Sequence, residues 1–266
     1  MSKISLFEID IDTRSPSELI EEIVKHVGKK DPPLRIVQLN PEMVVSLYHQ
    51  HSKRHIFDGV DIVVANGVGL QWAATFAETN KSFGSLMKTL YWIVFRSSRI
   101  QQHIGTRYTS SSFTAPLLSR LSLSNSHVLI AGSPKGSSIE TTAAHLRETA
   151  PGLRITSFDT EKFNAAKLTE LIHYIKHHKP DVALIAIGYP MQEDAAQKIQ
   201  KSMEHGVILT EGGTFDYQQF GGRIARAPKF FQRIGLEWLW RLLREPSRIR
   251  RQASLLKFIW ITYRKV

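Results

Sequence analysis

Short runs of β-branched and other apolar residues alternate with longer amphipathic segments through most of this 266-residue chain. The pattern predicts six strands, at residues 35–39, 61–65, 127–131, 153–157, 182–187 and 207–210. It predicts helices at residues 41–50, 68–77, 113–121, 138–149, 165–178 and 192–203. Such alternation is typical of a parallel sheet flanked by helices, so we predict an α/β fold that is Rossmann-like and mostly parallel.

Turn-forming residues directly follow three of the predicted strands. They are the segments Asn66-Gly67-Val68-Gly69, Gly132-Ser133-Pro134-Lys135-Gly136 and Gly188-Tyr189-Pro190. Ligands of open α/β sheets bind in the crevice at the carboxyl ends of the strands, so we expect these loops to line one site. The glycine pair Gly212-Gly213 follows the last predicted strand and either wraps a ligand or only turns the chain.

Two of these segments offer groups that could bind a ligand. The loop at Gly132 combines backbone amides at a predicted helix N-terminus with Lys135, an arrangement that can bind a diphosphate. Gln192 and Glu193 could hydrogen-bond a sugar or a base. Both loops also fit ordinary structural roles, since many strand-to-helix turns look like the first and acids are favoured in a first helical turn.

The composition excludes several kinds of site. The chain contains no cysteine, which rules out disulfides, thiolate metal sites and a cysteine nucleophile. Its eleven histidines show no H-E-x-x-H spacing, and we expect no D-x-D pair to hold a divalent cation on a diphosphate. We therefore predict no metal and no cofactor, with the charge of a donor diphosphate balanced by backbone amides, lysine and arginine.

Positive charge is concentrated at the end of the chain. Of the net charge of +11, almost all lies from Arg223 onward, where twelve lysine or arginine residues face two acids. Leucine and tryptophan alternate with these cations, which is typical of a helix at a lipid surface, although nucleic acid is a competing polyanion. We predict an α/β core at residues 1–222 and a basic amphipathic, membrane-binding tail at residues 223–266.

Residues 1–12 show no secretory signal, and the longest apolar run, residues 86–95, is about half of the roughly 20 residues that span a bilayer. We therefore expect a cytoplasmic protein that is peripheral at the inner face of the cell membrane, and we leave a homo-oligomer open. The segment 80–106 is the least regular part of the sequence. It suits either a mobile flap or a helix that touches the membrane.

Several linked motifs resemble the WecG/TagA/CpsF family of bacterial glycosyltransferases. Residues 188–193 resemble the family's G-x-P-x-Q-E and residues 212–216 its G-G-T-F-D. Residues 226–228, 235–242 and 245–248 resemble its R-A-P, G-L-E-W-L-x-R-L and E-P-x-R segments. Upstream, Asn40-Pro41-Glu42, Arg107-Tyr108-Thr109 and residues 132–136 resemble its N-P-E, R-V-T and glycine-loop blocks. The resemblance covers about residues 34–252.

The resemblance implies an inverting enzyme that moves a sugar from a nucleotide donor, expected to be a UDP-sugar, to a polyprenyl-diphosphate-linked acceptor in surface or exopolysaccharide biosynthesis. The residues it implies for catalysis are Asn40, Asn66, Arg107 and Gln192. Those expected to bind the donor are Gly132, Lys135, Gly136, Tyr189, Gln192, Glu193, Thr214 and Asp216. The acceptor phosphates are expected to meet Arg223, Arg226, Arg233 and Arg241, because a guanidinium makes paired hydrogen bonds to phosphate.

Two positions depart from the family pattern. The family's D-G-x-G segment is Asn66-Gly67-Val68-Gly69 here, and an amide cannot take a proton. Its R-V-T-G-x-D block loses the acid as well. Either another group, such as Asp61 or Asp216, deprotonates the acceptor, or leaving-group stabilisation lets the proton leave late. Two alternatives therefore stay open: a non-catalytic relative that binds nucleotide sugar or lipid carrier, and a nucleic-acid binder suggested only by the basic tail.

Overall fold

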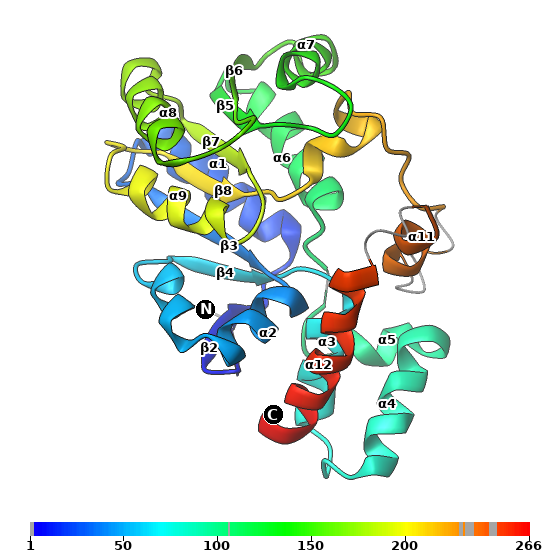
Figure 1. Cartoon of the computed structure of the whole chain (residues 1–266). Helices are drawn as coiled ribbons and strands as arrows, with labels where there is room; N and C mark the ends of the chain where they lie inside the picture. Colours follow the sequence, from blue (N-terminus) through cyan, green and yellow to red (C-terminus); the bar gives the residue numbers. More distant parts are fainter. Residues whose placement is uncertain (1–2, 106, 229–230, 232–236, 245–248) are drawn as a thin grey trace.

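The computed structural model describes residues 3–105, 107–228, 231, 237–244 and 249–266, and its centre is one eight-stranded sheet (Figure 1). The strand order is β1-β2-β4-β3-β8-β7-β5-β6. Strands β1 and β2 pair antiparallel, and every other neighbouring pair is parallel. The predicted α/β fold with a mostly parallel sheet is therefore confirmed.

All six predicted strands are present. They are β3 (Leu34–Leu39), β4 (Ile62–Ala65), β5 (His127–Gly132), β6 (Arg154–Asp159), β7 (Val182–Ala186) and β8 (Val207–Thr210). The sequence reading missed the hairpin of β1 (Lys3–Leu6) and β2 (Ile9–Asp12), whose strands have only four residues each. The turn residues of this hairpin, Phe7 and Glu8, both have positive φ angles. Neither is a residue type that signals such a turn in a sequence.

The predicted helices are also present, with small shifts at their ends. They are α2 (Pro41–His49), α3 (Val68–Ala77), α6 (Ser110–Ser122), α7 (Ile139–Thr149), α8 (Ala165–His178) and α9 (Met191–Gln200). Helix α1 (Pro16–Lys29) was missed, although Ser15 and Glu18 form a capping box at its start. The irregular segment 80–106 contains α4 (Phe83–Phe95) and the single turn α5 (Ser97–Ile100). The tail contains α11 (Glu237–Arg244) and α12 (Ile249–Lys265).

Helices cover both faces of the sheet, because alternate strand residues point to opposite sides. Ile36, Val128 and Leu184 pack in one apolar cluster with residues of α1, α6 and α7. On the other face, neighbouring strand residues pack against α2, α3 and α12 in one cluster, and against α8 and α9 in another. The sheet lies between these helix layers, and the parallel strands have their carboxyl ends at one edge of it.

Helix α12 lies against the body of the protein. Phe258 and Ile261 are buried in the same cluster as α2 and α3, and the ring of Phe258 lies 6.1 Å from that of Trp72. Part of the predicted tail therefore belongs to the packed core, while the division at residue 222 remains a prediction. Among the residues that the structure describes, no helix is both long and apolar enough to cross a bilayer.

Candidate active site

The loops after β3, β4, β5, β7 and β8 meet at the carboxyl edge of the sheet, as the sequence predicted. The segment after β4 depends on two glycines. Gly67 has a φ of +93°, and a Cβ at Gly69 would lie 2.6 Å from the ring of Pro41. The first residue of α2 and the first turn of α3 therefore approach each other closely, which brings the predicted catalytic residues Asn40 and Asn66 to the same edge.

Both asparagines make hydrogen bonds within the protein. The side chain of Asn40 caps α2 by accepting a bond from the backbone amide of Met43 at 3.0 Å. Asn66 donates from Nδ2 to Oε1 of Gln38 at 3.0 Å, and the other end of the Gln38 amide, Nε2, is buried without a partner. The amide of Asn66 is thus held by a residue that the sequence reading did not select.

Arg107 lies in the segment that runs beside the end of β4, where the amide of Tyr108 donates to the carbonyl of Ala65 at 3.0 Å. Burial lowers the pKa of Arg107, and the carboxylate of Glu237 in α11 opposes that shift. An arginine with reduced access to water forms stronger interactions with an anion than an exposed one does. Arg107 is therefore suited to a phosphate group at this edge.

Gln192 joins two of the strand-end loops. Its Oε1 accepts bonds from the amide of Gly188, at 3.2 Å, and from the amide of Gly212, at 3.0 Å. Its Nε2 donates to Oε1 of Glu193 at 2.8 Å. Because the side-chain amide is used on both sides, Gln192 fixes the loop after β7 to the loop after β8, and its role here is to position them.

Two buried carboxyl groups lie next to these loops. Burial raises the pKa of Glu193 to about 7, and its Oε2 has no hydrogen-bond partner. Burial also raises the pKa of Glu211 to about 7, and the hydroxyls of Thr114 and Thr214 donate to its two oxygens at 2.7 and 2.6 Å. Thr214, predicted to bind the donor, is fully buried and supports Glu211. The sequence reading assigned Glu211 no role of its own.

The glycine loop after β5 is held from the loop after β8. Asp216 accepts a hydrogen bond from the backbone amide of Lys135 at 2.9 Å. Gly136 has a φ of +72°, and a Cβ there would lie 3.2 Å from Cδ of Arg223. A predicted acceptor-phosphate residue therefore lies against the predicted donor loop, so a cation and the backbone of a glycine turn face the same region.

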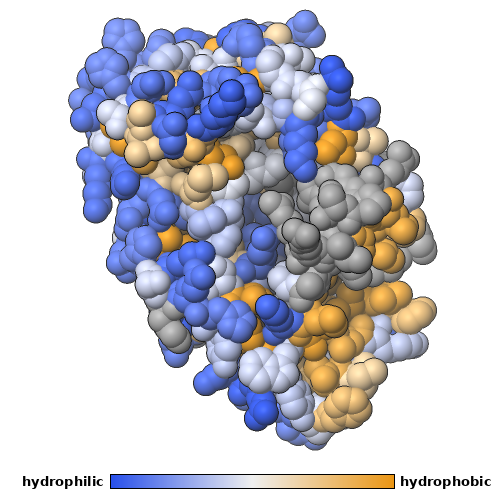
Figure 2. Space-filling model, viewed as in Figure 1, coloured by the Kyte–Doolittle hydropathy of each residue, from blue (hydrophilic) through white to orange (hydrophobic). Residues whose placement is uncertain are grey.

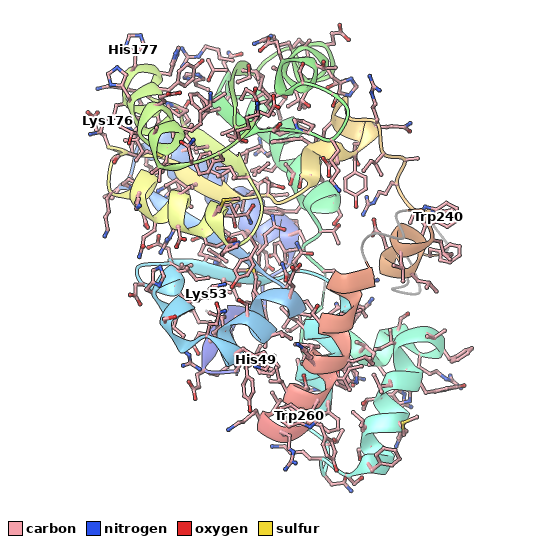
Figure 3. All side chains as sticks on the ribbon, in the orientation of Figure 1. His49, Lys53, Lys176, His177, Trp240 and Trp260 are labelled. Atoms are coloured by element: carbon pink, nitrogen blue, oxygen red, sulfur yellow. The ribbon has the colours of Figure 1, made fainter. Side chains whose placement is uncertain are left out.

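Tyr189 borders the site from the loop after β7. The ammonium group of Lys53 lies 5.7 Å from the centre of its ring, and burial raises the pKa of its phenol. Lys53 follows α2 at the front of the molecule (Figure 3). The ring of Tyr189 therefore lies against the segment that follows α2, and its hydroxyl is buried.

Arg226 connects the start of the tail to the edge of the sheet. Its Nη2 donates to the hydroxyl of Thr109 at 3.2 Å, and its Nε lies 3.4 Å from Oε1 of Glu237. Glu237 thus lies between the cations Arg226 and Arg107. Arg233 lies outside the described residues, and the structure does not describe the side chain of Arg241.

Comparisons with known proteins identify the family of the chain. Residues 4–84 and 91–266 match the glycosyl transferase WecG/TagA/CpsF family model. The chain belongs to this glycosyltransferase family. An N-acetylglucosaminyldiphosphoundecaprenol N-acetyl-beta-D-mannosaminyltransferase from Bacillus spizizenii is 26% identical over 224 residues, which cover 84% of this chain and 76% of that protein.

In this glycosyltransferase Asp61 is too far along the sheet to act as the base. It precedes β4, so it lies at the amino edge, opposite the strand-end loops. Its carboxylate accepts bonds from the backbone amide of Arg35 at 2.7 Å and from Gln200 at 2.9 Å. Asp216 lies at the correct edge but is bound to the glycine loop, so of the two proposed bases only Asp216 remains near the site.

The expectation that this glycosyltransferase has no D-x-D pair was wrong, because Asp10 and Asp12 of β2 form one. Asp12 is buried and accepts bonds from Nε of Arg14, which makes it a structural ion pair. No group of three metal-binding side chains occurs among the described residues. A pocket of about 340 Å³, lined by Lys176 and His205 among others, lies at the amino edge of the sheet and does not adjoin these loops.

Proposed function

We propose that this glycosyltransferase transfers a sugar from a UDP-sugar to a polyprenyl-diphosphate-linked acceptor during synthesis of a surface polysaccharide. The relative from Bacillus spizizenii is named for an acceptor of this class, N-acetylglucosaminyldiphosphoundecaprenol. The observation that carries the proposal is the convergence of the glycine loop at 132–136, Arg107, Arg223 and Arg226 at one edge of the sheet. Backbone amides and guanidinium groups are the donors that bind diphosphates without a metal.

The proposed reaction is a single displacement with inversion. The acceptor hydroxyl attacks the anomeric carbon, the bond from that carbon to the diphosphate oxygen breaks, and the hydroxyl proton leaves to a base or to water. Neither the side-chain amide of Asn66 nor that of Gln192, which is hydrogen-bonded within the protein, can take that proton. We therefore assign most of the rate acceleration to arginine residues that stabilise the leaving diphosphate. Asp216 and Glu193 are carboxylates that lie beside the loops.

The second candidate is a non-catalytic relative that binds nucleotide sugar or lipid carrier. Asn66 favours it, because the resemblance places an acid at this position. Both candidates would bind an anionic membrane surface, because the tail is rich in basic residues.

A transfer assay separates the candidates. The full chain is incubated with a panel of radiolabelled UDP-sugars, UDP-N-acetylmannosamine first, and with N-acetylglucosaminyl-diphosphoprenol in vesicles that contain phosphatidylglycerol, with and without a chelator. Transfer in both conditions supports the proposal. Binding of UDP-sugar without transfer indicates the non-catalytic relative, and loss of transfer in chelator contradicts the metal-free site.

A further inference from the structure

Helix α4 exposes an apolar stripe along its whole length. Phe83, Met87, Tyr91 and Phe95 follow one another at intervals of four residues and are 66%, 53%, 53% and 64% exposed. Residues four apart lie on the same face of a helix, so these four side chains form one continuous surface. A soluble helix normally turns polar residues to water on this face.

The opposite face of α4 is fixed to the protein. Leu86 and Thr89 are buried, and the indole of Trp72 in α3 donates to the hydroxyl of Thr89 at 2.9 Å. The apolar stripe is therefore not a consequence of a loosely attached helix. In Figure 2 hydrophobic residues gather on the side of the molecule where Figure 1 places α4 and α5. We name the surface formed by Phe83, Met87, Tyr91 and Phe95 the α4 stripe.

The charged residues of α4, α5 and the residue between them have one sign. The sequence contains no acidic residue between Glu78 and Glu140, whereas α4, α5 and the residue between them carry Lys88, Arg96 and Arg99. Trp92 lies between two of these cations, 5.2 Å from the ammonium of Lys88 and 5.1 Å from the guanidinium of Arg99. Aromatic rings beside lysine and arginine are typical of proteins at the boundary between lipid headgroups and acyl chains.

This charge pattern favours a bilayer over a second copy of the chain. In a two-fold dimer the α4 stripes would face each other and bring their cations together, which is unfavourable. The four side chains expose on the order of 450 Å², from about 200 Å² for each large side chain. A stable dimer buries about 800 Å² on each partner. An anionic lipid surface meets both the apolar area and the positive charge.

Another face of α4 lies near the candidate active site. A narrow pocket is lined by Val68 of α3, Ile93 of α4, Ile100 of α5 and Arg107. Helix α3 begins two residues after Asn66. Contact of α4 with a membrane would therefore bring the strand-end loops close to the lipid headgroups, where the diphosphate of a prenyl-linked acceptor lies.

We propose that α4 inserts its apolar stripe into the anionic bilayer that holds the acceptor, with Lys88, Arg96 and Arg99 at the headgroups. The identity of the acceptor rests on the function proposed above, whereas the insertion itself is a property of the surface. The family match is interrupted at residues 85–90, inside α4. In this proposal the tail contributes positive charge and α4 contributes the apolar anchor.

The absence of cysteine allows a direct test in the full chain. Three single variants, Met87→Cys, Leu256→Cys and Leu123→Cys, are labelled with an environment-sensitive fluorophore and mixed with vesicles of phosphatidylglycerol and phosphatidylcholine. All three side chains are exposed, with Leu256 in α12 and Leu123 at the end of α6, near the amino edge of the sheet. We expect a blue shift for the label at position 87 and none at position 123.

Three outcomes would overturn the proposal. The first is no fluorescence shift at position 87. The second is a shift at position 256 alone, which would assign docking to the tail. The third is a shift at position 87 that grows with protein concentration without vesicles, which would indicate a dimer. In a second measurement, the Phe83→Gln, Met87→Gln, Tyr91→Gln and Phe95→Gln variant should lose about tenfold or more of its vesicle flotation at high salt. Neither readout involves sugar transfer, so failure of the proposed function leaves them interpretable.

Discussion

The strand-end loops and the tail contribute different groups at the carboxyl edge of the sheet. In the loops, the polar side chains of Gln192, Asp216 and Thr214 are bonded to other parts of the protein and hold the loops in place. In the tail, Arg226 and Glu237 reach the edge of the sheet from outside. The loops are therefore held together by internal hydrogen bonds, whereas the tail brings charged side chains to the same edge of the sheet.

The comparison also shows that the tail is not uniform. Residues after Arg223 carry most of the net charge, yet α12 buries Phe258 and Ile261 among residues of α2 and α3. Figure 3 shows Trp240 on α11 and Trp260 on α12 well separated. A truncation near Phe220 therefore removes both a source of cations and part of the core, and point substitutions separate the two effects.

The largest expected effect is on stability and concerns α12. Phe258→Ala removes a ring that packs against Phe7 and Trp72, so we expect the free energy of unfolding to fall by about 3–5 kcal/mol. Urea denaturation followed by circular dichroism measures it. Leu256→Ala, at a position that is 73% exposed, is the control and should change stability by about 0.5 kcal/mol or less. Equal small effects would show that α12 is a separable appendage.

The next effect tests the buried carboxyl groups of the loops. The pKa of Glu211 is raised from 4.5 to about 7, so the folded protein binds a proton more tightly than the unfolded chain. Stability should therefore fall as pH rises from about 4.5 to about 7, by up to about 3 kcal/mol for this group. Unfolding in urea at pH 5 and pH 8 should show a smaller difference for Glu211→Gln than for wild type. The same difference in unfolding free energy between pH 5 and pH 8 in both proteins would contradict the raised pKa of Glu211. Glu148→Gln, at an exposed position on α7, is the control.

The third prediction concerns the cations of the tail. Arg226→Ala removes a guanidinium that contacts Thr109 and lies beside Glu237, and we expect kcat/KM for sugar transfer to fall about 10–100-fold. Lys257→Ala, an exposed position on α12, should change it about twofold or less. If both variants keep the wild-type rate, the tail does not contribute charge to the reaction.

The smallest effect tests the amide that replaces an acid. Asn66→Asp should raise turnover by about tenfold at most, because a carboxylate can accept the acceptor proton. The fold should tolerate the change, since the side-chain amide of Gln38 can turn and donate its unpaired Nε2 to the new carboxylate. Asn66→Ser is the matched control. Lower turnover in the acid variant, with the same thermal midpoint, would place the proton acceptor elsewhere.

Local patterns predicted most of the fold. All six parallel strands and six of the helices followed from apolar alternation and helix periodicity, because burial on both faces of a sheet leaves a strong signal. The hairpin at Lys3–Leu6 and Ile9–Asp12 did not, because its strands are partly exposed and include polar residues, unlike the fully buried four-residue strands β4 and β8. For α1, the capping box of Ser15 and Glu18 was the signal that could have been used.

The site was predicted less completely. The sequence identified the strand-end loops, because parallel strands bring their carboxyl ends to one edge. It could not show that Gln192 and Thr214 are engaged inside the protein, that Gln38 holds Asn66, or that Glu211 is buried beside Thr114. These pairs join residues between 3 and 97 positions apart in the chain, and only the packed structure brings them together.

The sequence by itself therefore determined the fold class, the family and the concentration of positive charge after Arg223. Those properties depend on residue order and on composition, which are local. The tertiary structure decided that Asp61 lies at the wrong edge, that α12 belongs to the core and that the apolar residues of α4 face outward. Each of these depends on which elements pack together, because the same apolar helix is a core element when it is covered and a membrane-binding surface when one face stays open.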